Sequence, residues 1–137
     1  MTVVDTGLAA EYAAIYAYGA ATVHLEGDPR SLAEELDAEH RSRRDTLLDF
    51  YDEHGLEAPP SEAGYDIAPV TDSAAAQELL LGVEQSVTAA WRTGVASTEP
   101  NEREICLRMY GASAVSLARF RLAVETSVAD PWPGRPE

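Results

Sequence analysis

Apolar side chains recur every three or four residues along most of this chain, which is the period of an α-helix. Four such stretches are separated by clusters of Gly and Pro, and no stretch of useful length alternates with the period of two that a strand requires. The predicted helices cover residues 6–25, 31–54, 73–95 and 100–124. The sequence therefore predicts an all-α protein.

Local signals place the ends of these helices. We expect residues 27–29, Gly-Asp-Pro, to end the first helix. Ser31 and Glu34 have the spacing of a capping box at the start of the second helix. Asp72 is a suitable N-cap for the third helix, and Pro100 suits the first turn of the fourth.

The connections between the predicted helices differ in length. Short turns join the first helix to the second and the third to the fourth, so each pair is expected to form an antiparallel hairpin. Residues 56–71 join the hairpins and contain three Pro and one Gly. Extended at ~3.3 Å per residue they reach about 50 Å, whereas a helix of about 22 residues is ~33 Å long. The long crossover linker predicts a ferritin-like four-helix bundle, with an up-down-up-down bundle as the alternative.

The chain of 137 residues fits one domain, which we place at residues 1–126, followed by an extended Pro-rich tail at residues 127–137. Cys106 is the only cysteine, which excludes an internal disulfide, and its apolar neighbours predict a buried thiol. No signal peptide is recognisable at the start, and no apolar run approaches the roughly 20 residues of a membrane span. We therefore expect a cytoplasmic location.

The chain is strongly acidic, with 24 acidic and 10 basic residues and a net charge of −14. Such a charge repels the phosphates of nucleic acids and the anionic surface of a membrane. It argues against both as partners, and leaves proteins and cations as the classes to consider.

Two glutamates, Glu11 and Glu84, are seventy-three positions apart, and each is followed by an i, i+3 pair at the same distance. The pair is Asp37 and His40 after Glu11, and Tyr110 and Ser113 after Glu84. A helical bundle that binds two metals on carboxylates uses a Glu from each of two helices and a Glu-x-x-His from each of the others. The sequence therefore has the outline of a duplicated di-metal site in which the second half has lost its ligands.

Helical spacing places these groups on the inner faces of their helices. Glu11 lies one turn from Leu8, and His40 lies one turn from Leu36. Arg44, one turn after His40, is expected to face inward with them. Unpaired charge in a core costs several kcal/mol, so these groups must pair, lose their charge or bind an ion.

Three interpretations compete for this set. Iron or manganese could bind as a pair, or as a single ion, on a ligand set drawn from Glu11, Asp37, His40 and Glu84. Alternatively, the site holds no metal, and Arg44 neutralises the carboxylates in a buried polar network with His40. We favour the network, because it explains why the carboxylates remain while half of the ligand set does not.

Five short segments of the chain form a recognisable set, and they are residues 10–19, 39–45, 69–72, 83–84 and 131–134. Together they resemble a small, uncharacterised ferritin-like family, a domain of unknown function common in high-GC Gram-positive bacteria. The resemblance implies a four-helix ferritin-like bundle and brings no activity with it. The wider superfamily includes iron-storage, peroxide-reducing and oxygen-activating di-iron proteins, from which Tyr110 and Ser113 depart.

From these observations we expect a protein that is not an enzyme, has no cofactor and acts as an interaction or structural module with a degenerate di-metal site. Symmetric self-association is common among such bundles, so a homodimer is expected. The alternative is a metal-dependent oxidoreductase or metal-binding protein of the ferritin or rubrerythrin type, using iron or manganese.

Overall fold

The computed structural model describes residues 2–97, 99–124 and 132–135. Within them lie α1 (Val3–Ala21), the 3₁₀ helix η1 (Thr22–His24), α2 (Gly27–Glu53), α3 (Ser73–Gly94) and α4 (Pro100–Ala123). None of the described residues belongs to a strand. The prediction of an all-α protein with four helices is therefore confirmed.

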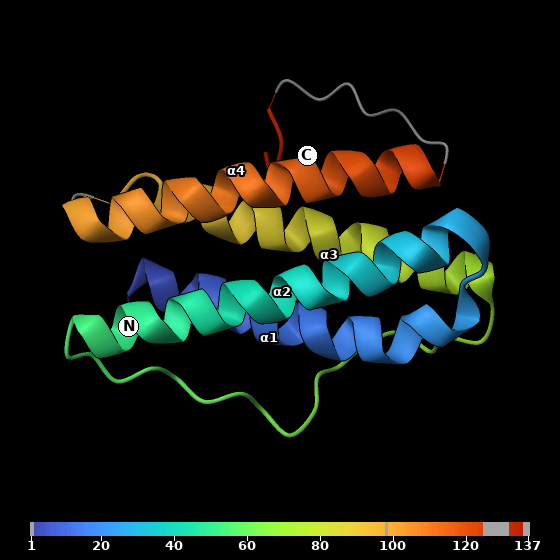
Figure 1. Cartoon of the computed structure of the whole chain (residues 1–137), viewed down its shortest axis with the longest axis horizontal. Coiled ribbons are helices and arrows are strands. Elements are labelled where there is room, and N and C mark those ends of the chain that lie inside the picture. Colours follow the sequence, from blue (N-terminus) through green and yellow to red (C-terminus); the bar gives the residue numbers. More distant parts are fainter. Residues whose placement is uncertain (1, 98, 125–131, 136–137) are drawn as a thin grey trace.

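The four helices form a bundle of two antiparallel hairpins, α1 with α2 and α3 with α4 (Figure 1). Residues 54–72 leave the end of α2 and run along the outside of the bundle to its opposite end, where α3 begins (Figure 1). Tyr65 of this linker packs against Tyr16 of α1, with ring centroids 5.6 Å apart. Because the linker spans the whole bundle, α2 and α3 are parallel, as in the ferritin-like arrangement and unlike an up-down-up-down bundle.

The first helix begins and ends earlier than its periodicity predicted. It starts at Val3 because Thr2 and Asp5 form a capping box, in which the Asp5 carboxylate accepts from the Thr2 N–H at 3.0 Å. It ends at Ala21, after which η1 leads to Leu25. The helical pattern continues through η1, and pattern alone does not distinguish a 3₁₀ turn from another turn of α-helix.

The predicted start of the second helix at Ser31 is wrong. Helix α2 begins at Gly27 with Glu26 as its N-cap, and Ser31 is an exposed residue inside the helix. Pro29 does not prevent this early start, because the first N–H groups of a helix have no intrahelical partner to lose.

The buried positions of α2 advance in steps of three and four, as in a coiled coil. They are Ala33, Leu36, His40, Arg43, Leu47 and Phe50, with Tyr51 buried beside the last of them. This seam keeps one face of α2 against its neighbours along most of the helix. Polar residues that fall on the seam are therefore forced into the core together.

The predicted extended tail at residues 127–137 lies mostly outside the described residues. Within it, residues 132–135 form a turn, in which the N–H of Arg135 donates to the carbonyl of Trp132 at 3.2 Å. Gly134 has a φ of +77°, and a Cβ there would lie 3.0 Å from backbone atoms of Thr88 and Ala89 on α3. Glycine therefore allows this turn to rest directly on the backbone of α3.

Candidate functional site

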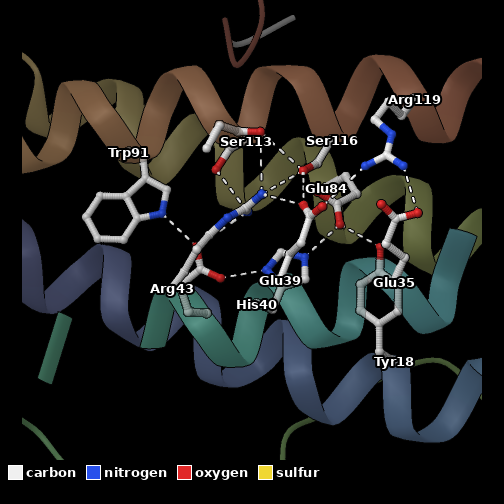
Figure 2. Close-up of polar contacts among 12 residues, drawn as sticks. Tyr18, Glu35, Glu39, His40, Arg43, Glu84, Trp91, Ser113, Ser116 and Arg119 are labelled. Atoms are coloured by element: carbon white, nitrogen blue, oxygen red, sulfur yellow. Dashed lines mark hydrogen bonds and ion pairs between the residues drawn. The ribbon is translucent and has the colours of Figure 1, made fainter. Parts of the chain in front are cut away.

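A cluster of charged side chains lies at the centre of the bundle (Figure 2). Glu11 of α1, His40 of α2 and Glu84 of α3 have no solvent-accessible surface. The Nδ1 atom of His40 is 2.6 Å from Oε2 of Glu11, and its Nε2 atom is 2.7 Å from Oε1 of Glu84. An imidazolium donates from both of its nitrogens, so this geometry suits the protonated form of the ring.

The pKa of His40 reflects this arrangement. Burial alone would lower the pKa of the ring, because it disfavours the charged form. The hydrogen bonds to Glu11 and Glu84, together with the charges of the two carboxylates, outweigh burial and raise the pKa to about 9. His40 therefore remains charged at neutral pH inside the core.

Arg43 supplies the second positive charge of the cluster. Its side chain is nearly buried, and its Nη1 atom is 3.8 Å from Oε1 of Glu11. The guanidinium also donates to the hydroxyl oxygens of Ser116, at 2.6 Å, and Ser113, at 3.4 Å, on α4 (Figure 2). Two carboxylates thus face two cations, and the cluster has no net charge.

The prediction that Arg44 belongs to this network is wrong by one residue. Arg44 pairs instead with the neighbouring Asp45, at 2.9 Å, near the surface. The buried seam of α2 steps from His40 by three residues to Arg43 and then by four to Leu47. A helix with 3.6 residues per turn allows either i+3 or i+4 to follow on the same face, and only packing against the other helices selects one.

Asp37 does not reach the cluster either. Its carboxylate accepts from Nε of Arg41, one turn along α2, at 3.2 Å, and its side chain is partly exposed. The seam passes through Leu36 instead, so Asp37 is turned towards the edge of the helix. Of the four predicted ligands, the structure brings together Glu11, His40 and Glu84.

Two aromatic residues also donate hydrogen bonds to the carboxylates, and they do so crosswise. Tyr18, seven residues after Glu11, donates its hydroxyl to Oε1 of Glu84 at 2.5 Å. Trp91, seven residues after Glu84, donates its Nε1–H to Oε1 of Glu11 at 3.0 Å. Each hairpin therefore donates a hydrogen bond to the glutamate of the other. Burial, and then the charge of Glu84, raise the pKa of Tyr18 well above its ordinary value, so its hydroxyl keeps its proton.

The two halves of the repeat differ at the positions of the i, i+3 pairs. Ser113 of α4 corresponds to His40, and its hydroxyl accepts from Arg43. Tyr110 corresponds to Asp37, and its hydroxyl donates to the carbonyl of Pro133 at 2.7 Å, which ties the C-terminal turn to α4. The guanidinium of Arg43 therefore extends from α2 into the half of the bundle in which Ser113 replaces a histidine.

A row of polar side chains, missed by sequence reasoning, links this cluster to the surface. Glu39 lies 3.5 Å from Nη2 of Arg43 and 3.2 Å from Nη1 of Arg119. Arg119 also pairs with Glu35 at 2.8 Å (Figure 2). The i, i+4 spacing of Glu35 and Glu39 places both on one face of α2, but the partner on α4 is eighty or more residues away in sequence, and no local signal points to it.

The donor set does not fit a pair of metal ions. Of the about six ligands of a carboxylate-bridged metal pair, the structure brings together Glu11, His40 and Glu84, and both nitrogens of His40 are directed at the carboxylates. In residues 2–97, 99–124 and 132–135, no three His, Cys, Asp or Glu side chains are grouped so that they could hold a metal ion. Among the buried side-chain atoms of the same residues, Oε2 of Glu84 is the one oxygen without a hydrogen-bond partner.

The fold and this centre define the class of protein as a ferritin-like four-helix bundle with a charged core. The chain belongs to the family described as a domain of unknown function (DUF4439), whose model matches residues 3–137. No curated protein sequence is detectably similar to it.

Solved structures that are similar to the chain include the following two. A conserved hypothetical protein, Rv2844, from Mycobacterium tuberculosis has a TM-score of 0.79 and 28% identity, with 88% of this chain and 92% of that chain covered. A dodecameric thioferritin, a bacterioferritin-related protein from Bacteroides fragilis, has a TM-score of 0.72 and 14% identity, over 90% of this chain and 82% of that one. The second similarity establishes the ferritin-like fold and nothing about chemistry.

None of the helices in the described residues is both long and apolar enough to cross a bilayer.

Proposed function

We propose that this protein is a non-catalytic ferritin-like module, whose core is stabilised by an internal cluster of charges where related bundles hold metals. It acts by associating with proteins, first of all with a second copy of itself. It needs no metal or other cofactor, and the cytoplasmic location expected from the sequence remains part of the proposal.

The observation that carries the proposal is the engagement of both nitrogens of His40 by buried carboxylates, at 2.6 Å to Glu11 and 2.7 Å to Glu84. A general acid or base must be within reach of a substrate proton. Here the two ring protons are directed to carboxylates that have no accessible surface. The titratable groups at the centre of the bundle are therefore occupied with one another.

The charge balance supports the same conclusion. His40 and Arg43 neutralise the charges of the two buried glutamates. The guanidinium of Arg43 reaches Ser113, in the half of the bundle that has no histidine. A divalent cation among these groups would have to displace a proton from His40 and approach the guanidinium of Arg43. Both steps raise the free energy of the metal-bound state.

A metal-binding protein or oxidoreductase remains the second candidate because of one atom. Oε2 of Glu84 is buried and has no partner among the described side chains, and an unpaired buried acceptor costs about 1–3 kcal/mol. A cation bound at this oxygen would remove that cost.

Metal analysis together with NMR tests the proposal. We expect no stoichiometric iron, manganese or zinc in untagged protein purified without chelator, or after anaerobic addition of ferrous iron. At neutral pH the ¹⁵N spectrum of the His40 ring should show two protonated nitrogens. Near-stoichiometric metal that is lost in Glu84→Ala, or a ring nitrogen of His40 without a proton, would refute the proposal and favour the oxidoreductase.

A further inference from the structure

Helix α4 carries an apolar stripe on its outer face. Leu107, Val115 and Leu122 are 56%, 61% and 70% exposed, which is unusual for large aliphatic side chains. Between them lie Gly111, which is exposed, and Ala114 and Ala118, which are half-buried. We call this set the α4 stripe, and its members are Leu107, Gly111, Ala114, Val115, Ala118 and Leu122.

The α4 stripe reads alike in both directions. From its midpoint between Ala114 and Val115, a small residue comes next on each side, Gly111 and Ala118, and a leucine comes last on each side. A contact with two-fold symmetry requires a surface that is complementary to itself. Two antiparallel copies of this stripe would set each Leu107 opposite Leu122 and each Gly111 opposite Ala118.

The small side chains at positions 111 and 118 would let the backbones of two α4 helices approach each other closely. A Cβ added to Gly111 would meet no atom of the described residues within 4 Å, so none of these residues packs against this position. Glycine in the interior of a helix costs about 1 kcal/mol relative to alanine. Close contact with a second helix would explain a glycine at this position, because a larger side chain would hold the two helices apart.

The charge distribution also favours this face. The protein has a net charge of −14, so two copies repel each other. Among the four helices, α4 is the one with more basic than acidic residues, since Arg103, Arg108, Arg119 and Arg121 outnumber Glu102 and Glu104. Approach through α4 therefore keeps the most acidic surfaces of the two copies apart.

We propose that the α4 stripe is the interface through which two copies of this chain form a two-fold symmetric dimer, with their α4 helices antiparallel and centred between Ala114 and Val115. The proposal rests on the self-association proposed above and adds the surface and the register. It commits to a second copy as the occupant, because the symmetry of the stripe suits no other partner as well.

Light scattering on the full chain over a concentration series is the first test. We expect a mass approaching twice 14.8 kDa as the concentration rises. Val115→Glu should raise the dissociation constant about 100-fold or more, because it places a charge at the centre of the contact, and Leu122→Glu should raise it as well, because it places a charge at each end. Val23→Glu is the matched control: Val23 is 66% exposed but lies on η1, and its substitution should leave the dissociation constant unchanged. Unchanged thermal melting would show that these exposed substitutions leave the fold intact.

Disulfide cross-linking then tests the register. The double variant Gly111→Cys, Ala118→Cys should form a covalent dimer on oxidation, since the proposed register brings these two positions of different copies within the Cα separation of about 7 Å that a disulfide allows. Each single variant should not, because a position and its own copy are about two helical turns apart along the axis. The unaltered chain is the control for Cys106, which is buried.

The outcomes separate the two proposals. A dimer that withstands Val115→Glu and Leu122→Glu, or that cross-links in a single variant, would overturn the α4 interface and leave self-association standing. A mass of 14.8 kDa at every concentration would overturn both, and the stripe would then belong to a different protein partner.

Discussion

The imidazole of His40 donates to the carboxylate of Glu84 over 2.7 Å, although the two residues lie on parallel helices and are separated by the whole crossover linker. This contact depends on the length of the linker, because a short turn would have made α2 and α3 antiparallel. The topology of the chain and the charge of its core are therefore connected.

The charge of His40 predicts how stability depends on pH. The pKa of His40 is raised from 6.5 to about 9 in the folded protein. The contribution of its charge to the free energy of unfolding is therefore fully present below about pH 6.5 and is lost as the pH rises through about 9. Across this range we expect the free energy of unfolding to fall by up to about 3 kcal/mol. Urea denaturation at successive pH values measures this fall. It should persist in His24→Gln and be absent in His40→Gln; a fall that persists in His40→Gln would contradict the assignment.

Adjacent arginines on α2 provide a matched pair of variants. Arg43→Met leaves Glu11, which has no solvent-accessible surface, without one of its cations, so we expect a loss of about 3–5 kcal/mol of stability. Arg44→Met removes a surface pair with Asp45 and should change stability by less than about 0.5 kcal/mol. Thermal or chemical denaturation compares the two. Equal losses would contradict the assignment of Arg43, rather than Arg44, to the buried cluster.

The tyrosines of α1 test the crosswise hydrogen bonds. Tyr18→Phe removes the donor to Oε1 of Glu84, a carboxylate that already has one oxygen without a partner. We expect a loss of about 1–3 kcal/mol. Tyr16→Phe is the control, because Tyr16 is 42% exposed, and its stability should match the unaltered chain. A Tyr18→Phe variant that is as stable as Tyr16→Phe would show that the hydroxyl of Tyr18 contributes nothing to the cluster.

Glycines of α1 test the packing around Trp91. A Cβ on Gly7 would lie 2.2 Å from atoms of the Trp91 ring, which must then shift away from Glu11. Overpacking of this kind costs about 1–3 kcal/mol, so Gly7→Ala should lower the melting temperature. A Cβ on Gly19 would meet no atom within 4 Å in the part of the chain that the structure describes, so Gly19→Ala should raise stability by up to about 1 kcal/mol. The same direction of change in both variants would contradict this account of the packing.

The sequence by itself determined the class of fold. Its three-to-four period predicts helices, and the long stretch of Pro and Gly between the hairpins predicts the crossover, because both are local properties of the chain. It also determined that Glu11, His40 and Glu84 would meet, since the offset between the glutamates repeats the spacing of the two hairpins. These predictions depend only on the spacing of residues along the helices, and regular helical geometry converts that spacing directly into relative positions in the bundle.

Only the tertiary structure decided which neighbouring side chains entered the core. Arg43 is buried and Arg44 is not, and Asp37 turns to Arg41, because the inner seam advances in steps of three and four that are fixed by packing between helices. The pairing of Arg43 with Ser116 was equally out of reach, since the two residues are seventy-three positions apart and no local pattern relates them. Helical periodicity predicts which face of a helix is buried. It does not predict which of two neighbouring charged residues on that face enters the core.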